Sequence, residues 1–125
     1  MSYTAQATVY QDSGISNLAR ITSSTGGYLI AAGVTSIERM VFERLTQNVV
    51  LTQSSLTVST VMSTLTSSSV MWGIDATGYN FKDDVPVTAT PAADTEYIVE
   101  YKVTPAAGEI FKLQFLLETA VTLST

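Results

Sequence analysis

The stretches YIVEYKV at 97–103 and FKLQFLLE at 111–118 decide the fold class of this chain. In the first, tyrosine, valine or another apolar residue occupies every second position, with Glu100 and Lys102 between them. In the second, Phe and Leu alternate in the same way with Lys112 and Gln114. Alternation with a period of two is typical of a strand that buries one face. Both stretches are therefore predicted to be half-buried strands.

The connection between these strands, Thr104 to Gly108, contains Pro and Gly and is short enough for a hairpin loop. A register shifted by one residue would bury Glu100, Lys102 and Lys112, at a high cost in solvation. We therefore predict an antiparallel hairpin that buries Tyr97, Val99, Tyr101, Phe111, Leu113 and Phe115. Because a lone hairpin is marginal in water, its apolar face predicts a second layer.

The remaining segments also favour strands. The length of 125 residues fits one domain, and the abundance of Ser, Thr and Val suits pleated sheets better than helices. Strands are expected at 4–10, 18–23, 49–52, 55–58 and 70–74, with a further edge strand at 120–123. A helical turn capped by Ser59 is expected over Thr60 to Leu65. The acid-rich segment from Asp75 to Ala93 is predicted to be a long loop with at most one short strand.

The segment Thr35 to Val50 is ambiguous. Its apolar residues at 37, 40, 41 and 45 fit helical spacing, and Thr35 with Glu38 forms a capping box. The segments on both sides are β-rich, which favours a strand here as well. We predict a single all-β sandwich domain over residues 1–125, with one short helical turn as an option.

Composition excludes several functions. The chain has no cysteine and no histidine, so it lacks thiolate chemistry, disulfides, the commonest general base and the commonest metal ligand. A net charge of −5 argues against nucleic acid as a partner. The start MSYTAQATVY does not resemble a signal peptide, and no apolar run is long enough to span a membrane. We expect a non-enzymatic protein without a cofactor, a metal or a membrane partner.

Several candidate sites in the sequence also have plainer interpretations. The acidic segment Asp75 to Asp84 offers oxygen ligands for calcium, but it lacks EF-hand spacing and includes Lys82. A carboxylate pair for glycoside hydrolysis would have to come from Asp75, Asp83 and Asp84. The run Ser23 to Gly27 lacks the lysine of a phosphate-binding loop and is interpreted as a turn. No catalytic, cofactor-binding or metal residue is assigned.

Aromatic residues offer one more possibility. The piece Gly78 to Phe81 is expected to be a turn that buries one ring and exposes the other. Exposed rings of Trp72, Tyr79 and Tyr28 would suit a small carbohydrate- or ligand-binding module, which is the alternative function.

The sequence at 72–81, WGIDATGYNF, together with 97–111, YIVEYKVTPAAGEIF, resembles a pattern in small uncharacterised β proteins of phages and prophage-like gene clusters. It is similar, more loosely, to the immunoglobulin-like domains of phage tails, baseplates and capsid decoration proteins. The resemblance covers the C-terminal half and implies an antiparallel immunoglobulin-like β-sandwich. Trp72 and Tyr97 could fill the core Trp and Tyr positions of such domains, although the paired cysteines are missing.

The function expected from these observations is structural. We predict a component of a phage particle or similar assembly, such as a capsid decoration, head–tail junction, tail or baseplate protein, assembled in the host cytoplasm. Its partners would be copies of itself or other virion proteins. The segments Thr4–Tyr10 and Ala120–Leu123 lack charge and proline, which usually guard sheet edges. At least one of them is expected to lie against another chain.

Overall fold

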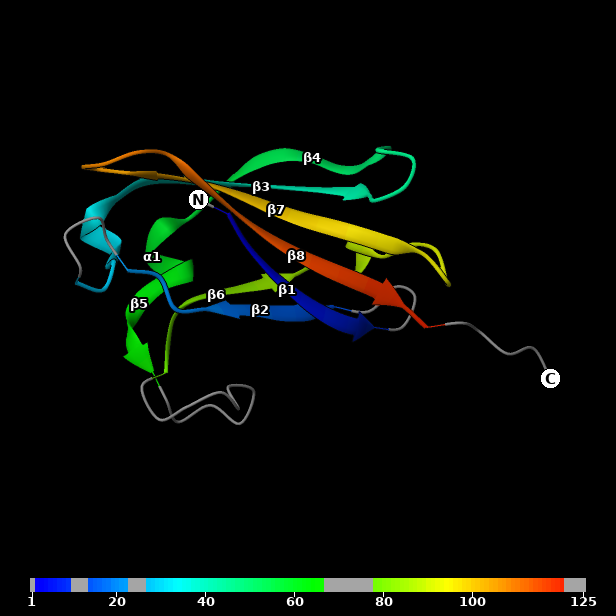
Figure 1. Ribbon diagram of the computed structural model, residues 1–125, viewed down its shortest axis with the longest axis horizontal. Coiled ribbons are helices and arrows are strands. Elements are labelled where there is room, and N and C mark those ends of the chain that lie inside the picture. Colours follow the sequence, from blue (N-terminus) through cyan, green and yellow to red (C-terminus); the bar gives the residue numbers. More distant parts are fainter. Residues whose placement is uncertain (1, 10–13, 23–26, 67–77, 121–125) are drawn as a thin grey trace.

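The computed structural model describes residues 2–9, 14–22, 27–66 and 78–120 as two packed β-sheets (Figure 1). The elements follow one another as β1 (Ser2–Val9), β2 (Ile15–Ala19), a 3₁₀ turn (Ala31–Gly33), β3 (Val34–Glu43), β4 (Val49–Leu56), α1 (Val58–Val61), β5 (Met62–Thr66), β6 (Tyr79–Val85), a second 3₁₀ turn (Val87–Ala89), β7 (Glu96–Pro105) and β8 (Phe111–Thr119). The large sheet has the order β1-β8-β7-β3-β4, and the small sheet has the order β2-β6-β5.

The predicted hairpin forms the centre of the large sheet. β7 and β8 pair antiparallel, with Val99 opposite Phe115 and Tyr101 opposite Leu113. Of the six residues predicted to be inside, five are buried and Phe111 is half-buried. Lys112 is exposed, so the register is the predicted one.

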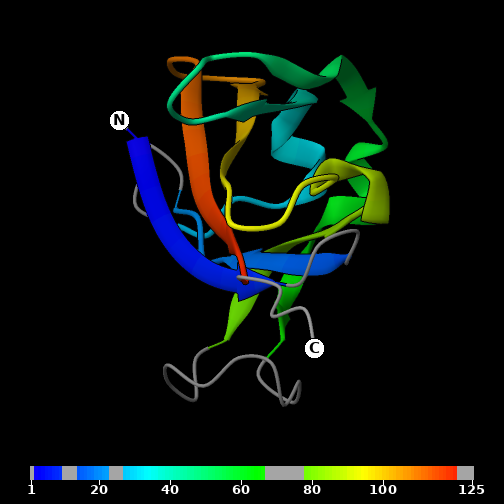
Figure 2. The same ribbon diagram turned by 90° about the vertical axis from the view of Figure 1, so that its right-hand side faces the viewer.

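β1 lies beside β8 at the edge of the large sheet (Figure 2). The two strands run parallel, with Ser2 opposite Lys112 and Val9 opposite Thr119. This is the only parallel pair among the described strands. The expected N-terminal strand is therefore confirmed, and the fold is an all-β, mostly antiparallel sandwich.

The strand order is that of an immunoglobulin-like sandwich. In that fold one sheet contains strands B, E and D, and the other contains G, F, C and C′. Here β2, β6 and β5 take the first three places, while β8, β7, β3 and β4 take the other four. Near the start of β7, in position F, the Tyr97 hydroxyl accepts a hydrogen bond of 2.9 Å from the amide of Ala92. A tyrosine that binds backbone just upstream of strand F is a feature of these domains.

The expectation that Trp72 fills a core position falls on a residue outside the described part of the chain. The core tryptophan of antibody-type domains lies on strand C. That place belongs to β3, which contains no tryptophan. Residue 72 lies between β5 and β6 in the sequence, outside the described residues, as does the whole strand expected at 70–74.

The ambiguous segment 35–50 is a strand in its first part. β3 extends to Glu43 and buries Ile37 and Val41, so the helix suggested by the capping box does not form. A turn follows at 44–48, where Gln47 adopts a positive φ of 63°, and β4 begins at Val49. The strands expected at 49–52 and 55–58 belong to one continuous strand as far as Leu56, whereas Val58 begins α1.

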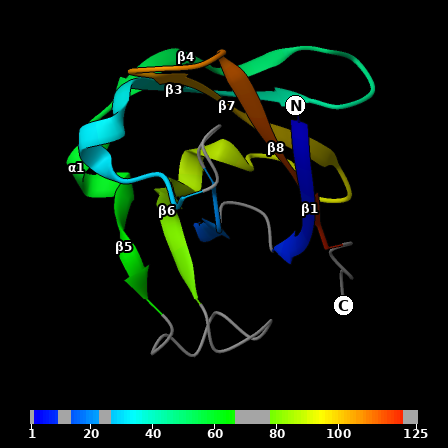
Figure 3. The ribbon, with the colours of Figure 1, turned by 60° about the vertical axis from the view of Figure 1, so that its left-hand side comes forward.

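Two predicted boundaries were wrong. β2 ends at Ala19, because the side chain of Asn80 binds the amide of Ile21 at 2.7 Å. The helical turn begins at Val58, and Thr57 precedes it without a side-chain cap, so Ser59 is not the cap. Figure 3 shows that the chain enters β5 directly after this turn. Of the expected strand 120–123, residues 121–123 lie outside the described part, and β8 itself ends at Thr119.

The largest error concerns the loop predicted at 75–93. Residues 79–85 form β6, the seven-residue central strand of the small sheet, in a segment where at most one short strand was expected. Tyr79 and Phe81 are both buried, so 78–81 is not a turn with one exposed ring. Asn80 and Asp83 are buried as well, which explains why the segment looks like a loop in the sequence.

One apolar core lies between the sheets. The Phe81 ring of β6 packs edge-on against Tyr101 of β7, with ring centres 4.9 Å apart. Tyr101 in turn meets Phe115 of β8 at 5.7 Å and nearly at right angles. The three rings join strands from both sheets. No helix among the described residues is long and apolar enough to cross a membrane.

Candidate functional site

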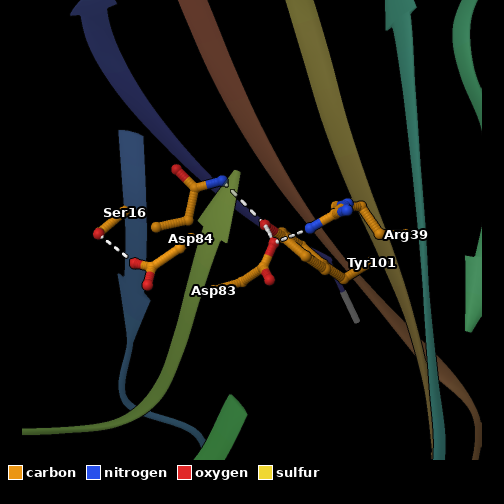
Figure 4. Close-up of polar contacts among 6 residues, drawn as sticks. Ser16, Arg39, Asp83, Asp84 and Tyr101 are labelled. Carbon is orange, nitrogen blue, oxygen red and sulfur yellow. Dashed lines mark hydrogen bonds and ion pairs between the residues drawn. The ribbon is translucent and has the colours of Figure 1, made fainter. Parts of the chain in front are cut away.

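Four polar side chains meet between the sheets (Figure 4). Asn17 of β2 and Asp83 of β6 are cross-strand neighbours in the small sheet, and Arg39 of β3 and Tyr101 of β7 are cross-strand neighbours in the large sheet. Each pair projects toward the other sheet. We call these four residues the inter-sheet cluster.

A continuous chain of hydrogen bonds connects the inter-sheet cluster. The amide of Asn17 donates to the Tyr101 hydroxyl at 3.0 Å, and that hydroxyl donates to Oδ2 of Asp83 at 2.6 Å. Arg39 donates to the same oxygen through Nη1 at 2.8 Å. The side chains of Arg39 and Asp83 are only 14% and 6% exposed. No described buried side-chain nitrogen or oxygen lacks a partner, so the cluster is fully satisfied.

The electrostatics of the inter-sheet cluster keep the Tyr101 hydroxyl protonated. Burial raises its pKa far above the ordinary value, and the Asp83 carboxylate raises it further by its charge and by its hydrogen bond. A hydroxyl held in its neutral form beside a carboxylate that is already paired with Arg39 does not serve as a general base. The arrangement suits a structural link between the sheets.

This link lies in the region where antibody-type domains place a disulfide. In antibody-type domains a disulfide joins strands B and F, and its second cysteine lies two residues after the corner tyrosine. In this chain that position is Val99, and no cysteine exists. The hydrogen bond from Asn17 on β2 to Tyr101 on β7 joins the same two strands one inward-facing position farther along β7.

The candidate carboxylates do not converge. Asp83 points inward to Arg39, whereas Asp84 points outward and accepts a hydrogen bond of 2.5 Å from Ser16 (Figure 4). Successive strand residues face opposite sides of a sheet, so these two cannot share a ligand. Asp83 and Asp84 therefore form neither the calcium loop nor the glycosidase-type pair considered for this segment from its sequence, and Asp75 lies outside the described residues.

The candidate platform rings do not gather on one surface. Tyr79 is buried at 6% exposure, whereas Tyr28 is 48% exposed. Trp72 and residues 23–26 of the Ser23–Gly27 run lie outside the described residues. A ring in the core cannot stack on a sugar, so Tyr79 is not available for the ligand-binding role.

Sequence reasoning missed the outer face of the large sheet. A row of apolar residues crosses four strands of this face: Val49 pairs with Phe42, Phe42 with Ile98, and Ile98 with Leu116. Val49 is 52% exposed, and Leu45 in the neighbouring turn is 79% exposed. We call this row the apolar band. The register of four neighbouring strands is needed to find it, and no single stretch of sequence displays it.

An acidic hollow lies at one end of this face. Four acids line it: Glu43, Asp94, Glu96 and Glu118. Glu96 is partly neutralised by Arg44, 3.4 Å away on the surface. Within the described part of the chain, no three acids come together in a way that could hold a metal ion. The hollow adds negative charge to one end of the sheet and does not form a metal centre.

Comparison with protein-family models, with curated proteins and with solved structures found no match.

Proposed function

We propose that this protein is a non-enzymatic structural component of a phage particle or a similar assembly, with copies of itself or other virion proteins as partners. The observation that carries the proposal is the nature of the two rims of the large sheet. β1 and β4 are its outermost strands, and each pairs on only one side with another described strand. Their sequences, SYTAQATV and VVLTQSSL, contain no charged residue and no proline.

Such rims are unusual in a protein that works alone. An edge strand presents unpaired amides and carbonyls, and natural proteins guard it with charge, proline or a covering segment. β4 has eight residues, and none of them is buried. Its register with β3 shifts near Val41, and bulges of this kind give only local protection. A strand or face of another chain would satisfy these groups.

The polar groups of the interior favour the same conclusion. Arg39, Asp83 and Tyr101 use their hydrogen-bonding groups within the inter-sheet cluster. The alternative, a carbohydrate- or ligand-binding module, depended on exposed rings at positions 28, 72 and 79. Burial of Tyr79 weakens it. A role in assembly uses the outer surface and leaves the interior to hold the sheets together.

The experiment is sedimentation velocity of the purified protein from micromolar to millimolar concentration. We expect species heavier than the monomer to accumulate as concentration rises. Thr52→Lys places a charge on an exposed position of β4 and should weaken the association, whereas Ser59→Lys, on the exposed side of α1, should not. A single monomeric species at every concentration would contradict self-assembly.

A further inference from the structure

The charges on the outer face of the large sheet form a pattern that is complementary to itself. Three neighbouring strands carry opposite charges at their two ends on this face. These are Glu38 on β3 with Arg44 directly after the end of β3, Lys102 and Glu96 along β7, and Lys112 and Glu118 along β8. Glu38 lies opposite Lys102, and Lys102 opposite Lys112, so these three residues form one row across the sheet. Glu96 lies opposite Glu118, and Arg44 is ion-paired with Glu96, so the other three form the second row.

The two rows are equally distant from one line across the sheet. On each strand the midpoint between the two charges falls at Val41, Val99 or Phe115, and these three residues pair with one another in the register. A half-turn about an axis along that line would place Lys102 over Glu96, Lys112 over Glu118 and Glu38 over Arg44 of a second copy. Opposite charges would meet on all three strands.

We infer that the partner of this face is a second copy of the chain, stacked face to face about a two-fold axis that runs across the strands. The inference rests on the proposed assembly function and names the surface and the partner. An isologous interface requires a self-complementary patch, and the charge pattern supplies one. Opposed charges of this kind select the register and exclude wrong partners.

The centre of the face holds both apolar and polar residues, and the half-turn sets Met40 against Phe42, Ile98 against Glu100 and Leu116 against Gln114 of the second copy. The apolar residues that are partly exposed there are Phe42 and Ile98 of the apolar band and Met40 of β3, whereas Leu116 is already buried in the single chain. The one acid near the centre, Glu100, already accepts a hydrogen bond of 2.7 Å from Gln114 and lies 3.4 Å from Lys112. Its charge is therefore partly compensated before a second copy arrives.

The charge match depends on the angle at which the two stacked sheets cross. Aligned sheets cross at about 30°, and the charges lie about 10 Å from the axis, so each opposed position moves by about one strand spacing. A shift of this size toward β8 sets Lys102 against Glu118 but also sets Glu38 against Glu96. A shift toward β3 sets Lys112 against Glu96 but also sets Lys102 against Arg44, so the full match requires strands that cross at a much smaller angle.

The test exchanges the charges of β8 and measures the dimer dissociation constant by sedimentation equilibrium. Lys112→Glu alone and Glu118→Lys alone should each weaken the dimer by at least roughly tenfold, because each sets like charges against one another twice. The double variant restores opposite charges and should return to within about threefold of the parent. Lys82→Glu on β6 of the small sheet makes the same change in net charge as Lys112→Glu and should leave the dimer dissociation constant unchanged.

The outcomes separate this inference from the proposed function. The two-fold stack is supported if the single variants dimerise more weakly than the parent, the double variant regains the parent's affinity, and Lys82→Glu leaves the dimer dissociation constant unchanged. Self-association that is insensitive to the single changes, or a double variant as weak as the singles, overturns the stack and leaves the assembly function standing. A parent protein that stays monomeric overturns both. Circular dichroism melts of all the variants establish that each is folded.

Discussion

Removal of Arg39 should destabilise the fold more than removal of an exposed arginine, because Arg39 is ion-paired with the buried carboxylate of Asp83. Arg39→Met keeps most of the aliphatic bulk and leaves the Asp83 carboxylate, 6% exposed, with the Tyr101 hydroxyl as its remaining partner in the inter-sheet cluster. Breaking a buried ion pair on one side costs about 3 kcal/mol, because a charge is left without compensation. For a domain of this size that corresponds to a fall in Tm of about 10 °C.

The decisive comparison is Asp83→Asn in two backgrounds. With Arg39 present, the change removes the carboxylate that pairs with the guanidinium and should destabilise the fold by about 1–2 kcal/mol. With Arg39→Met, the same change removes an uncompensated buried charge and should stabilise the fold by about the same amount. The sign of the effect therefore depends on Arg39.

Urea unfolding followed by tryptophan fluorescence measures all four proteins. Arg44→Met is the matched control, because its pair with Glu96 is 50% and 35% exposed and contributes about 0.5 kcal/mol or less. If Asp83→Asn has the same effect with and without Arg39, the two residues are not coupled and the account of the inter-sheet cluster is wrong.

Further predictions concern single groups. The side-chain amide of Asn80 donates to the carbonyls of Ile21 and Leu29, and its oxygen accepts from the Ile21 amide. In urea unfolding, Asn80→Asp should therefore lower the free energy of unfolding by about 4 kcal/mol and Asn80→Ala by about 3 kcal/mol. Equal losses would contradict the assignment of donors. The pKa of Tyr101 is raised in the folded state, so its hydroxyl contributes fully to the free energy of unfolding below the unfolded-state pKa of about 10. That contribution is lost as the pH rises above this value toward the folded-state pKa. Unfolding free energies measured from neutral to alkaline pH should therefore fall less steeply for Tyr101→Phe than for the parent, by about 1.4 kcal/mol per pH unit above pH 10, and parallel curves would refute the assignment.

The fold could be predicted from the sequence where alternation is regular. β7 and β8 display their apolar and polar residues on opposite faces, so the register at Val99 and Phe115 follows from period two alone. β6 could not be recognised in the same way. Asn80 and Asp83 are polar residues in buried positions, and their partners lie 59 and 44 residues away in the sequence. The local sequence pattern does not show that distant residues supply the hydrogen bonds that allow these polar side chains to be buried.

A signal for the inter-sheet cluster was nonetheless present. Once β3 is assigned as a strand, Arg39 falls between Ile37 and Val41 on the inward face. An inward arginine requires a buried acid, which predicts that one carboxylate from the acid-rich half is inside. The apolar band and the two charged rows needed the pairing of β3, β7 and β8, because they exist only across strands.

The most direct test of the central claim, that the large sheet carries the function by meeting another chain, is amide hydrogen exchange at low and high protein concentration. The account predicts that exchange slows at high concentration in peptides from β4 at the rim, residues 49–56, whereas peptides from the small sheet, residues 62–66 and 79–85, do not change. Protection that appears in the small sheet, with none in β4, would contradict it.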